Sequence, residues 1–308
     1  MLYNEQKLES FSRRAFKYEE QKIIDTHHAI RDAIVLCYDK KAVEEKYGFS
    51  PDLEVYLQGS YKNSTNVTQT SDVDVVVQLK TLWRDNREVL SADQRAKYEA
   101  LHSSVSYPFE AFNFAIMNAM QQYFGAGNVT NDNKCLKIKE HGKYGNADIV
   151  PCFTYRYYGY FESVEQQKFR EGIYFFTNDG TFVRNFPKLH YEALTQKSEA
   201  TNGIFKETVR MFKNMRDDLT DKGWLYSGVA KSYFIENLLY NLPNSCFTRT
   251  RMEAFKQVLA LLNMMLGANL IRNFKCANGI DGLFGERHWS YYDAEHFFEA
   301  LNRAQRTT

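Results

Sequence analysis

The stretch "LQGSYKNSTNVTQTSDVDVVVQL", from Leu57 to Leu79, carries the strongest structural signal in the chain. A turn rich in Gly, Ser, Asn and Thr leads into a β-branched segment, which favours a strand buried on both faces. That strand opens with Asp72 and Asp74, and side chains two positions apart on a strand point to the same face. Two carboxylates that close repel each other and are costly to dehydrate, so the pattern needs a compensating cation.

A third acid stands on another strand-like run, "NADIVPCF", in which Asp148 precedes Ile149 and Val150. Carboxylate oxygens suit Mg²⁺ or Mn²⁺, and two such ions can clamp an in-line phosphoryl displacement. Taken alone, however, the Asp-x-Asp pattern is better explained by a surface turn or by solvated acids at a strand end. Its meaning therefore depends on the turn that precedes it.

The turn "QGSYKNST" offers groups that can bind phosphate. The backbone N–H groups around Gly59, the hydroxyl of Ser60 and the positive end of a short following helix can together hold phosphate oxygens. If the turn stood alone, an ordinary Gly-Ser turn would be the simpler interpretation. Because it precedes Asp72 and Asp74 by the length of one short helix, we predict that it holds a triphosphate whose metal ions the acids bind.

Composition limits the classes of function. The chain has 308 residues, of which 44% are hydrophobic and 25% are charged, so it can bury the core of two modest domains or one large one. A net charge of +1 favours small ligands over long nucleic acid. Five cysteines without a CxxC pair indicate reduced thiols, and Cys135 and Cys152 are expected in the core. No apolar run resembles a signal peptide or a membrane span, so we expect a cytoplasmic protein without a membrane partner.

Hydrophobic periodicity predicts an α+β half over residues 1–186 and a helical domain over residues 187–308. From about Asn4 to Lys46 it predicts one long helix, or two in series, packing across both halves. The polar segment 84–104 is expected to be a surface excursion. Strands are predicted over 53–57, 73–79, 135–140 and 146–153, with "TYRYYGYFE" and "GIYFFTND" extending the sheet. Helices are predicted over 109–124 and near 187–198, 203–218, 228–241, 250–268 and 291–305.

The Gly-Ser turn, the Asp72-x-Asp74 pair and Asp148 together resemble the signature of the DNA polymerase β-type nucleotidyltransferase superfamily. In the second half, "TNGIFKETVRMFKNMRDDL" and "KSYFIENLLY" resemble the bacterial cGAS/DncV-like nucleotidyltransferases (CD-NTases), with features of their E clade. This resemblance implies a polymerase β-like nucleotidyltransferase core with a mixed sheet, and a C-terminal helical domain that completes the nucleotide-binding cleft. It also implies that the three acids are catalytic and hold two Mg²⁺ (or Mn²⁺) ions per site.

The resemblance assigns phosphate contacts in both halves of the chain. Lys213 lies on the same predicted helix face as Lys206 and Arg210, and a cationic face of this kind can contact triphosphate oxygens. A solvated basic face is an equally good interpretation for Lys206. Nucleotide binding at the phosphate end is implied for Gln58, Gly59, Ser60, Lys213 and Ser232.

The resemblance also suggests residues that contact the bases. Tyr233 is expected to stack on a base, although the residues alone favour a core position on an amphipathic helix. Asn202 precedes the helix of Lys213, where it is expected to cap that helix, to select uracil over a purine, or both. His190 fits no metal-ligand spacing and is expected to be a surface or structural residue.

The implied activity is that of a cyclic oligonucleotide second-messenger synthase. Such an enzyme would join ATP with a second ribonucleotide, with UTP and GTP as candidates, and release a cyclic dinucleotide and pyrophosphate. Family analogy adds antiphage signalling, a downstream cyclic-nucleotide effector and a monomeric state. The alternatives are a template-independent RNA or oligonucleotide nucleotidyltransferase with linear products, which predicts a basic RNA platform, and an inactive nucleotide-binding scaffold.

Overall fold

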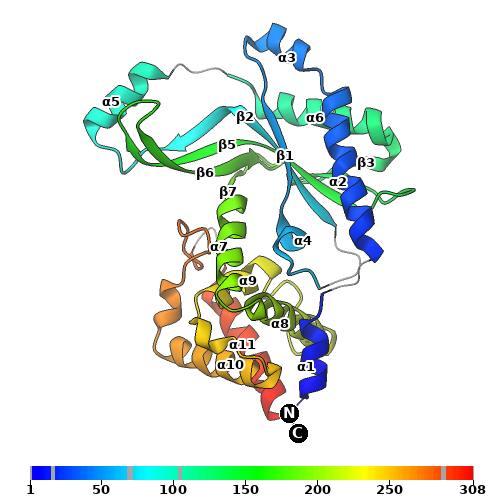
Figure 1. Cartoon of the computed structure of the whole chain (residues 1–308), viewed down its shortest axis with the longest axis vertical. Helices are drawn as coiled ribbons and strands as arrows, with labels where there is room; N and C mark the ends of the chain where they lie inside the picture. Colours follow the sequence, from blue (N-terminus) through cyan, green and yellow to red (C-terminus); the bar gives the residue numbers. More distant parts are fainter. Residues whose placement is uncertain (1, 15–17, 68–71, 103–105, 286–288, 308) are drawn as a thin grey trace. The chain divides into compact units, whose positions relative to one another are not determined.

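The computed structural model describes residues 2–14, 18–67, 72–102, 106–285 and 289–307. The chain divides into two compact units (Figure 1). The helical unit comprises Met1–Ala15, Ser60–Gln69 and Leu189–Thr308, and the sheet unit comprises Phe16–Gly59 and Thr70–Lys188. Two early segments of the chain thus belong to the helical unit.

A mixed sheet forms the centre of the sheet unit. In the described part of the chain its strands follow the order β1-β2-β5-β4-β3, and β6 and β7 continue the sheet from the later half of β5. β2 and β5 run parallel, and the other neighbouring strands run antiparallel. The strands are β1 (Leu53–Leu57), β2 (Val73–Asn86), β3 (Val129–Asn131), β4 (Leu136–Ile138), β5 (Ala147–Phe161), β6 (Gln167–Phe176) and β7 (Phe182–Asn185).

β2 confirms the prediction of a strand buried on both faces. Val75, Val76 and Val77 are consecutive, so their side chains alternate between the faces, and none of the three is exposed. The strand does not stop at the predicted Leu79. After a register shift against β5 it continues to Asn86, so the start of the polar segment belongs to the sheet. The rest of that segment contains helix α5 (Ala92–Leu101), which begins with a capping box.

Two helices cover one face of this sheet. α6 (Phe109–Phe124) has the predicted bounds and packs against α2 (Tyr18–Cys37), while both helices also contact strands of the sheet (Figure 1). The ring of Phe112 on α6 lies 5.2 Å from that of Phe153 on β5. Because Phe153 stands an odd number of positions from Asp148, the two side chains point to opposite faces. The face that carries Asp148 is therefore not the face that α6 covers.

The opening segment differs from the prediction. Where the structure describes residues 4–47, it has three helices, α1 (Glu5–Ser12), α2 and α3 (Lys40–Tyr47), rather than one or two. α1 ends at Ser12, because the backbone of the following residue, Arg13, is extended. α1 belongs to the helical unit, whereas α2 and α3 belong to the sheet unit. Helical periodicity continues across this break, so the apolar pattern alone does not reveal it.

α1 is held in the helical unit by apolar packing and by the Glu5 carboxylate, which caps α10. It contacts α8 and α10, and its Leu8 is fully buried, which stabilises the fold by about 1.5–3 kcal/mol. The carboxylate of Glu5 accepts hydrogen bonds from the backbone N–H groups of Arg251 and Met252 at 2.7 and 2.6 Å. It thereby satisfies two otherwise unpaired donors in the first turn of α10.

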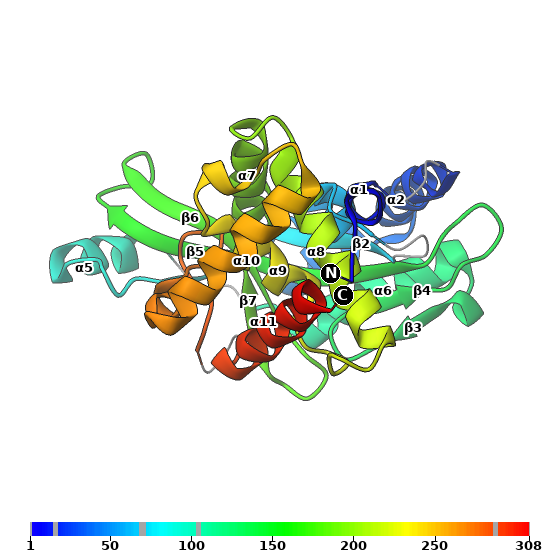
Figure 2. The same ribbon diagram turned by 90° about the horizontal axis from the view of Figure 1, so that it is seen from below.

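The helices predicted in the second half are confirmed to within a few residues. α8 packs against α1, α9, α10 and α11 (Figure 2). Most of its apolar side chains are buried, among them Phe205, Val209 and Phe212. None of the helices in the described part of the chain is both long and apolar enough to cross a membrane. The remaining helices are α4 (Gly59–Asn63), α7 (Pro187–Glu199), α8 (Ile204–Asp221), α9 (Ser232–Tyr240), α10 (Arg251–Gly267) and α11 (Tyr291–Arg306), with short 3₁₀ turns at Ala126–Asn128, Asn244–Cys246 and Leu270–Asn273.

Candidate active site

Two of the three predicted acids are register partners. Asp74 on β2 pairs with Asp148 on the neighbouring parallel strand β5. Paired residues of adjacent strands project from the same face, so both carboxylates point to the face that α6 leaves uncovered. Both residues are only partly buried, while Val73, Val75, Ala147 and Ile149 beside them are buried.

The carboxyl group of Asp148 sits in an unfavourable electrostatic environment. Burial raises its pKa above the ordinary value of 3.8, and the negative charge of Asp72 raises it further. The ammonium of Lys137 and a hydrogen bond from Cys135 act in the opposite direction. Within the described part of the chain, the buried Oδ1 of Asp148 has no hydrogen-bond partner. A buried acceptor without a partner costs free energy, and a cation would satisfy it.

Gly59 lies directly against the second acid. Its φ is +70°, in the left-handed region that favours glycine, and a Cβ there would come within 2.0 Å of Asp74 Oδ2. The backbone N–H of Gln58 donates to the carbonyl oxygen of Asp74 at 2.9 Å, which fixes the turn to the start of β2. Only glycine therefore allows this turn to pass so close to the Asp74 carboxylate.

Asp72 precedes β2, and it is exposed. Its charge acts on Asp148, which places the two acids near each other, but it is not part of the strand ladder. Among the residues that the structure describes, no group of three or more His, Cys, Asp or Glu side chains is arranged to hold a metal ion. The structure thus pairs Asp74 with Asp148 and leaves Asp72 beside the pair.

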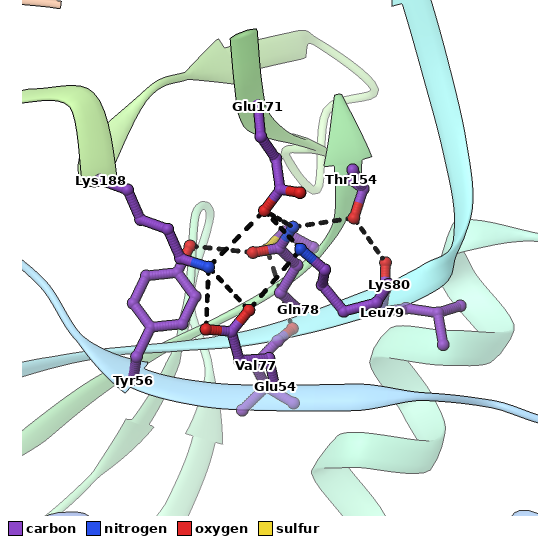
Figure 3. A network of polar contacts seen from close by, with 10 residues as sticks. Glu54, Tyr56, Val77, Gln78, Leu79, Lys80, Thr154, Glu171 and Lys188 are labelled. Atoms are coloured by element: carbon purple, nitrogen blue, oxygen red, sulfur yellow. Dashed lines mark hydrogen bonds and ion pairs between the residues drawn. The ribbon is translucent and has the colours of Figure 1, made fainter. Parts of the chain in front are cut away.

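A polar network lies on the same sheet face, farther along the strands (Figure 3). Asp74, Val76 and Gln78 occupy alternate positions of β2, so the amide of Gln78 points to the side of the acids. This amide accepts from the hydroxyl of Tyr56 at 3.1 Å and donates to Thr154 Oγ1 at 2.8 Å. Gln78 is fully buried, and these bonds satisfy both ends of its side chain.

Four charged side chains complete this network (Figure 3). Lys188, at the start of α7, donates to both oxygens of Glu54 at 2.8 and 2.7 Å and lies 3.6 Å from Glu171. Lys80 pairs with Glu171 and lies 3.7 Å from Glu54. A cation in the first turn of a helix is unfavourable, and the two carboxylates offset that effect. Within the sheet unit, the network therefore holds Lys188 against β1 and β6.

The other predicted site residues lie in the helical unit, and Lys213 among them is deeply buried. Its side chain is 1% exposed, and its ammonium donates to Glu236 Oε1 at 2.7 Å and to the carbonyl and hydroxyl oxygens of Thr65 at 3.1 and 3.2 Å. Burial lowers the pKa of Lys213, and the charge of Glu236 partly reverses this effect. Arg210, predicted to share its face, donates to the backbone carbonyls of Ser12 and Ser64.

Tyr233 stands in the first turn of α9, directly after Ser232. Its ring stacks on His190 at 4.4 Å and on Trp289 at 5.5 Å between centroids. Burial raises the pKa of its hydroxyl. His190 is itself buried, and its Nε2 lies 2.8 Å from Glu236 Oε2, so the structural role expected for His190 is confirmed.

Asn202 does not cap α8, so that expectation is wrong. The N-cap residue of α8 is Gly203, with φ of +85°, and this position provides no side-chain capping hydrogen bond. The hydroxyl of Thr201 instead accepts the backbone N–H of Phe205 at 3.2 Å. Asn202 is exposed and has a left-handed backbone with φ of 50°, a conformation that asparagine tolerates better than most residues. Its amide is therefore not used in capping.

Comparison with known proteins agrees with this geometry. Residues 192–306 match the profile of the cGAS/DncV-like nucleotidyltransferase C-terminal helical domain. The cyclic nucleotide synthase CdnE01 of Staphylococcus haemolyticus is 36% identical over 267 residues, which are 85% of this chain and 88% of that protein. The chain belongs to the CD-NTase family. A second relative of this CD-NTase, the cyclic UMP-AMP synthase of Rhodothermus marinus, is 39% identical over 251 residues, 81% of this chain and 83% of the relative.

The fold of this CD-NTase matches a solved structure over nearly its whole length. The Rhodothermus marinus CdnE c-UMP-AMP synthase, solved with Apcpp and Upnpp, superposes with a TM-score of 0.82 at 35% identity, covering 98% of this chain and 96% of that chain. The expected fold, a mixed α+β core with a C-terminal helical domain, is thereby confirmed. The enzyme class is that of a nucleotidyltransferase.

Sequence reasoning missed two neighbours of the acids in this CD-NTase. Lys137 on β4 is the register partner of Asp148, and its ammonium pairs with Asp132 at 2.7 Å. Cys135, expected in the core, is only partly buried and hydrogen-bonds Asp148, and burial raises the pKa of its thiol to about 12. The short "HGKYG" turn between the predicted strands 135–140 and 146–153 is the sequence signal for the antiparallel pairing of β4 with β5. From that pairing, the position of Lys137 beside Asp148 could have been found. Cys152 is buried as expected.

Proposed function

We propose that this CD-NTase joins two ribonucleoside triphosphates into a cyclic dinucleotide and releases pyrophosphate. The observation that carries the proposal is the register pairing of Asp74 with Asp148 beside Gly59. Relatives covering more than four fifths of the chain are named as cyclic nucleotide synthases, including the cyclic UMP-AMP synthase of Rhodothermus marinus. Linear tailing of RNA is the less favoured reaction, since none of these relatives is named for it.

The acids fit a pair of hard divalent cations. Carboxylate oxygens are the ligands that Mg²⁺ and Mn²⁺ prefer, and the unpartnered Oδ1 of Asp148 is an acceptor that a cation would satisfy. Asp72 and Asp74 would hold both ions, and Asp148 would hold the one that serves the acceptor hydroxyl. When bound, the ions lower the pKa of that hydroxyl and neutralise charge on the pyrophosphate.

The chain's own groups place the reacting atoms. The backbone of Gly59, flanked by Gln58, and the hydroxyl of Ser60 hold the donor triphosphate. Asp148, as a ligand of the ion nearer the acceptor hydroxyl, would help to activate that hydroxyl for attack on the α-phosphate. A second attack of the same kind on the linear intermediate closes the ring.

The helical unit supplies the remaining contacts with nucleotide. Ser232 and Lys213 contact the triphosphate, and Lys213 exchanges a bond to Thr65 for a phosphate oxygen, since all three of its protons are already donated. Tyr233 stacks on a base, exchanging its contact with Trp289 for one with the base. Asn202 offers an amide that can pair with both the donor and the acceptor of a uracil edge, so UTP joins ATP and GTP among the candidate substrates.

The biological setting follows from the family. The cyclic product signals to a downstream effector in cytoplasmic antiphage defence, and the enzyme acts as a monomer. This part of the proposal rests on analogy with the family.

A product assay tests the proposal. The chain is incubated with all four labelled ribonucleoside triphosphates and Mg²⁺ or Mn²⁺, treated with phosphatase and resolved by chromatography and mass spectrometry. Small phosphatase-resistant products are expected, and they should vanish in the Asp72→Asn/Asp74→Asn variant while its circular dichroism stays unchanged. Label found only on added RNA, or product made by the double variant, would contradict the proposal.

A further inference from the structure

Glu236 on α9 is the centre of a buried polar cluster within the helical unit. Only 3% of the residue is exposed. Its Oε1 accepts from Lys213 at 2.7 Å and from the hydroxyl of Thr65. Its Oε2 lies 2.8 Å from His190 Nε2 and 3.4 Å from Asn63 Nδ2. Four polar side chains from three other segments thus meet on one carboxylate.

The charges of Glu236 and Lys213 make each of these buried side chains depend on the other. Burial by itself raises the pKa of Glu236, but the ammonium of Lys213 and the hydrogen bond and charge of His190 hold it well below the ordinary value, so the carboxylate is ionised. Lys213 is equally buried and faces it. Removing either partner leaves the other as an unpaired buried charge, which is far more costly than losing an exposed ion pair.

The segments that Glu236 joins are those expected to hold phosphate. Asn63 ends α4, the helix that carries Ser60, and Thr65 follows it. Lys213 is on α8, bound to Thr65 as well as to Glu236. We propose that Glu236 is a positioning residue that holds Lys213 and the Ser60 segment in one fixed arrangement for the nucleotide's phosphates. This inference rests on the proposed function and adds a residue to it that touches no substrate.

The physical advantage is pre-organisation. A free lysine side chain carries about 2 kcal/mol of rotamer entropy, part of which would be lost each time its ammonium engaged a phosphate. Glu236 confines the ammonium before the nucleotide binds, so less ordering remains at the binding step. Glu236 also neutralises the buried charge while no phosphate is present.

The test compares triphosphate with monophosphate binding in the full-length chain. Glu236→Gln keeps the shape of the side chain and removes its charge. Calorimetry is expected to show the Kd for ATP rising about tenfold or more, with the Kd for AMP little changed, because Lys213 loses the charge-assisted contact that positions it for the triphosphate. Glu207→Gln is the matched control, since it removes an ion pair with Arg251 from α8 without touching the cluster. Its Kd for ATP should equal that of the parent.

A double-mutant cycle keeps the inference testable if Glu236→Gln loses stability. Lys213→Met/Glu236→Gln removes the ammonium together with the carboxylate that pairs with it, so its Tm should exceed that of Glu236→Gln. If Glu236 acts through Lys213, the double variant binds ATP as weakly as Lys213→Met alone. Additive effects of the two substitutions, or a fall in Tm with the Kd for ATP unchanged, would overturn the inference. Failure of the synthase proposal is a separate result, namely a parent chain that binds ATP but forms no product.

Discussion

Asp74 and Asp148 occupy the same register position on two neighbouring parallel strands, and both project from the face that α6 does not cover. The pairing brings together two carboxylates that lie far apart in the chain. Burial and the negative charge of Asp72 raise the pKa of Asp148, and in the described part of the chain its buried Oδ1 has no hydrogen-bond partner. The charged form of Asp148 is therefore unfavourable without a counter-ion, as is common in sites that bind a cation.

Replacing Asp148 should separate stability from activity. Its folded-state pKa lies above that of the unfolded chain, so the unfolded chain loses its proton first as the pH rises. The free energy of unfolding therefore falls across the window just above 3.8. Asp148→Asn has no carboxyl group to titrate at this position, so the loss of unfolding free energy should disappear. The Tm at neutral pH should rise, while product formation should be abolished.

Scanning calorimetry from pH 4 to 8, with and without Mg²⁺, checks this prediction. Mg²⁺ should raise the Tm of the parent but have little effect on the variant. A lower Tm for the variant at neutral pH would refute the electrostatic interpretation.

Gly59→Ala should disable the site through a clash. Its Cβ would come within 2.0 Å of Asp74 Oδ2, so the carboxylate must move, and product formation should fall to near background. Gly48→Ala is the matched control, because Gly48 has a similar φ of +74° but a Cβ added there would meet nothing within 4 Å. The control should lose only about 1 kcal/mol of stability and keep its activity. Equal losses of activity in the two variants would show that backbone strain, rather than the clash, is responsible.

Tyr233→Ala should weaken nucleotide binding by about 1–3 kcal/mol, the value of one base–aromatic stack. The ring also packs on His190 and Trp289, so the alanine variant should be less stable as well. Tyr233→Phe keeps the ring, and it separates the two effects because it should retain both stability and most of the affinity. Binding is measured by calorimetry and stability by thermal unfolding. If Tyr233→Ala is destabilised but its KM is unchanged, the residue belongs to the core alone.

Asn202→Gly should change base preference without unfolding the start of α8. Glycine accepts the left-handed backbone of this position, and the cap bond comes from Thr201, so Tm should change little. If the amide selects uracil, mass spectrometry of products from mixed triphosphates should show fewer uridine and more purine products. An unaltered product spectrum would remove Asn202 from base selection.

Local sequence patterns predicted many helices and strands correctly. They failed where contacts between residues far apart in the sequence determine the structure. β1 and α6 have the predicted bounds because each is a compact apolar pattern closed by glycine or flanked by turn residues. The prediction for the opening helix was wrong because its periodicity continues across the break after Ser12, while α1 packs on α8 and α10. The capping role of Asn202 was wrong because Thr201, one position earlier, makes the bond.

The amino-acid sequence alone determined the chemistry that the chain can carry. A Gly-Ser turn, two acids at alternate strand positions and a third acid on another apolar run are local patterns, and local spacing decides which side chains share a face of one element. Only the tertiary structure decided which elements become neighbours. It paired β2 with β5, so that Asp148 meets Asp74, and it buried Lys213 against Glu236. The reason is that strand pairing and helix packing depend on the burial of apolar surface over the whole unit, which no single segment encodes.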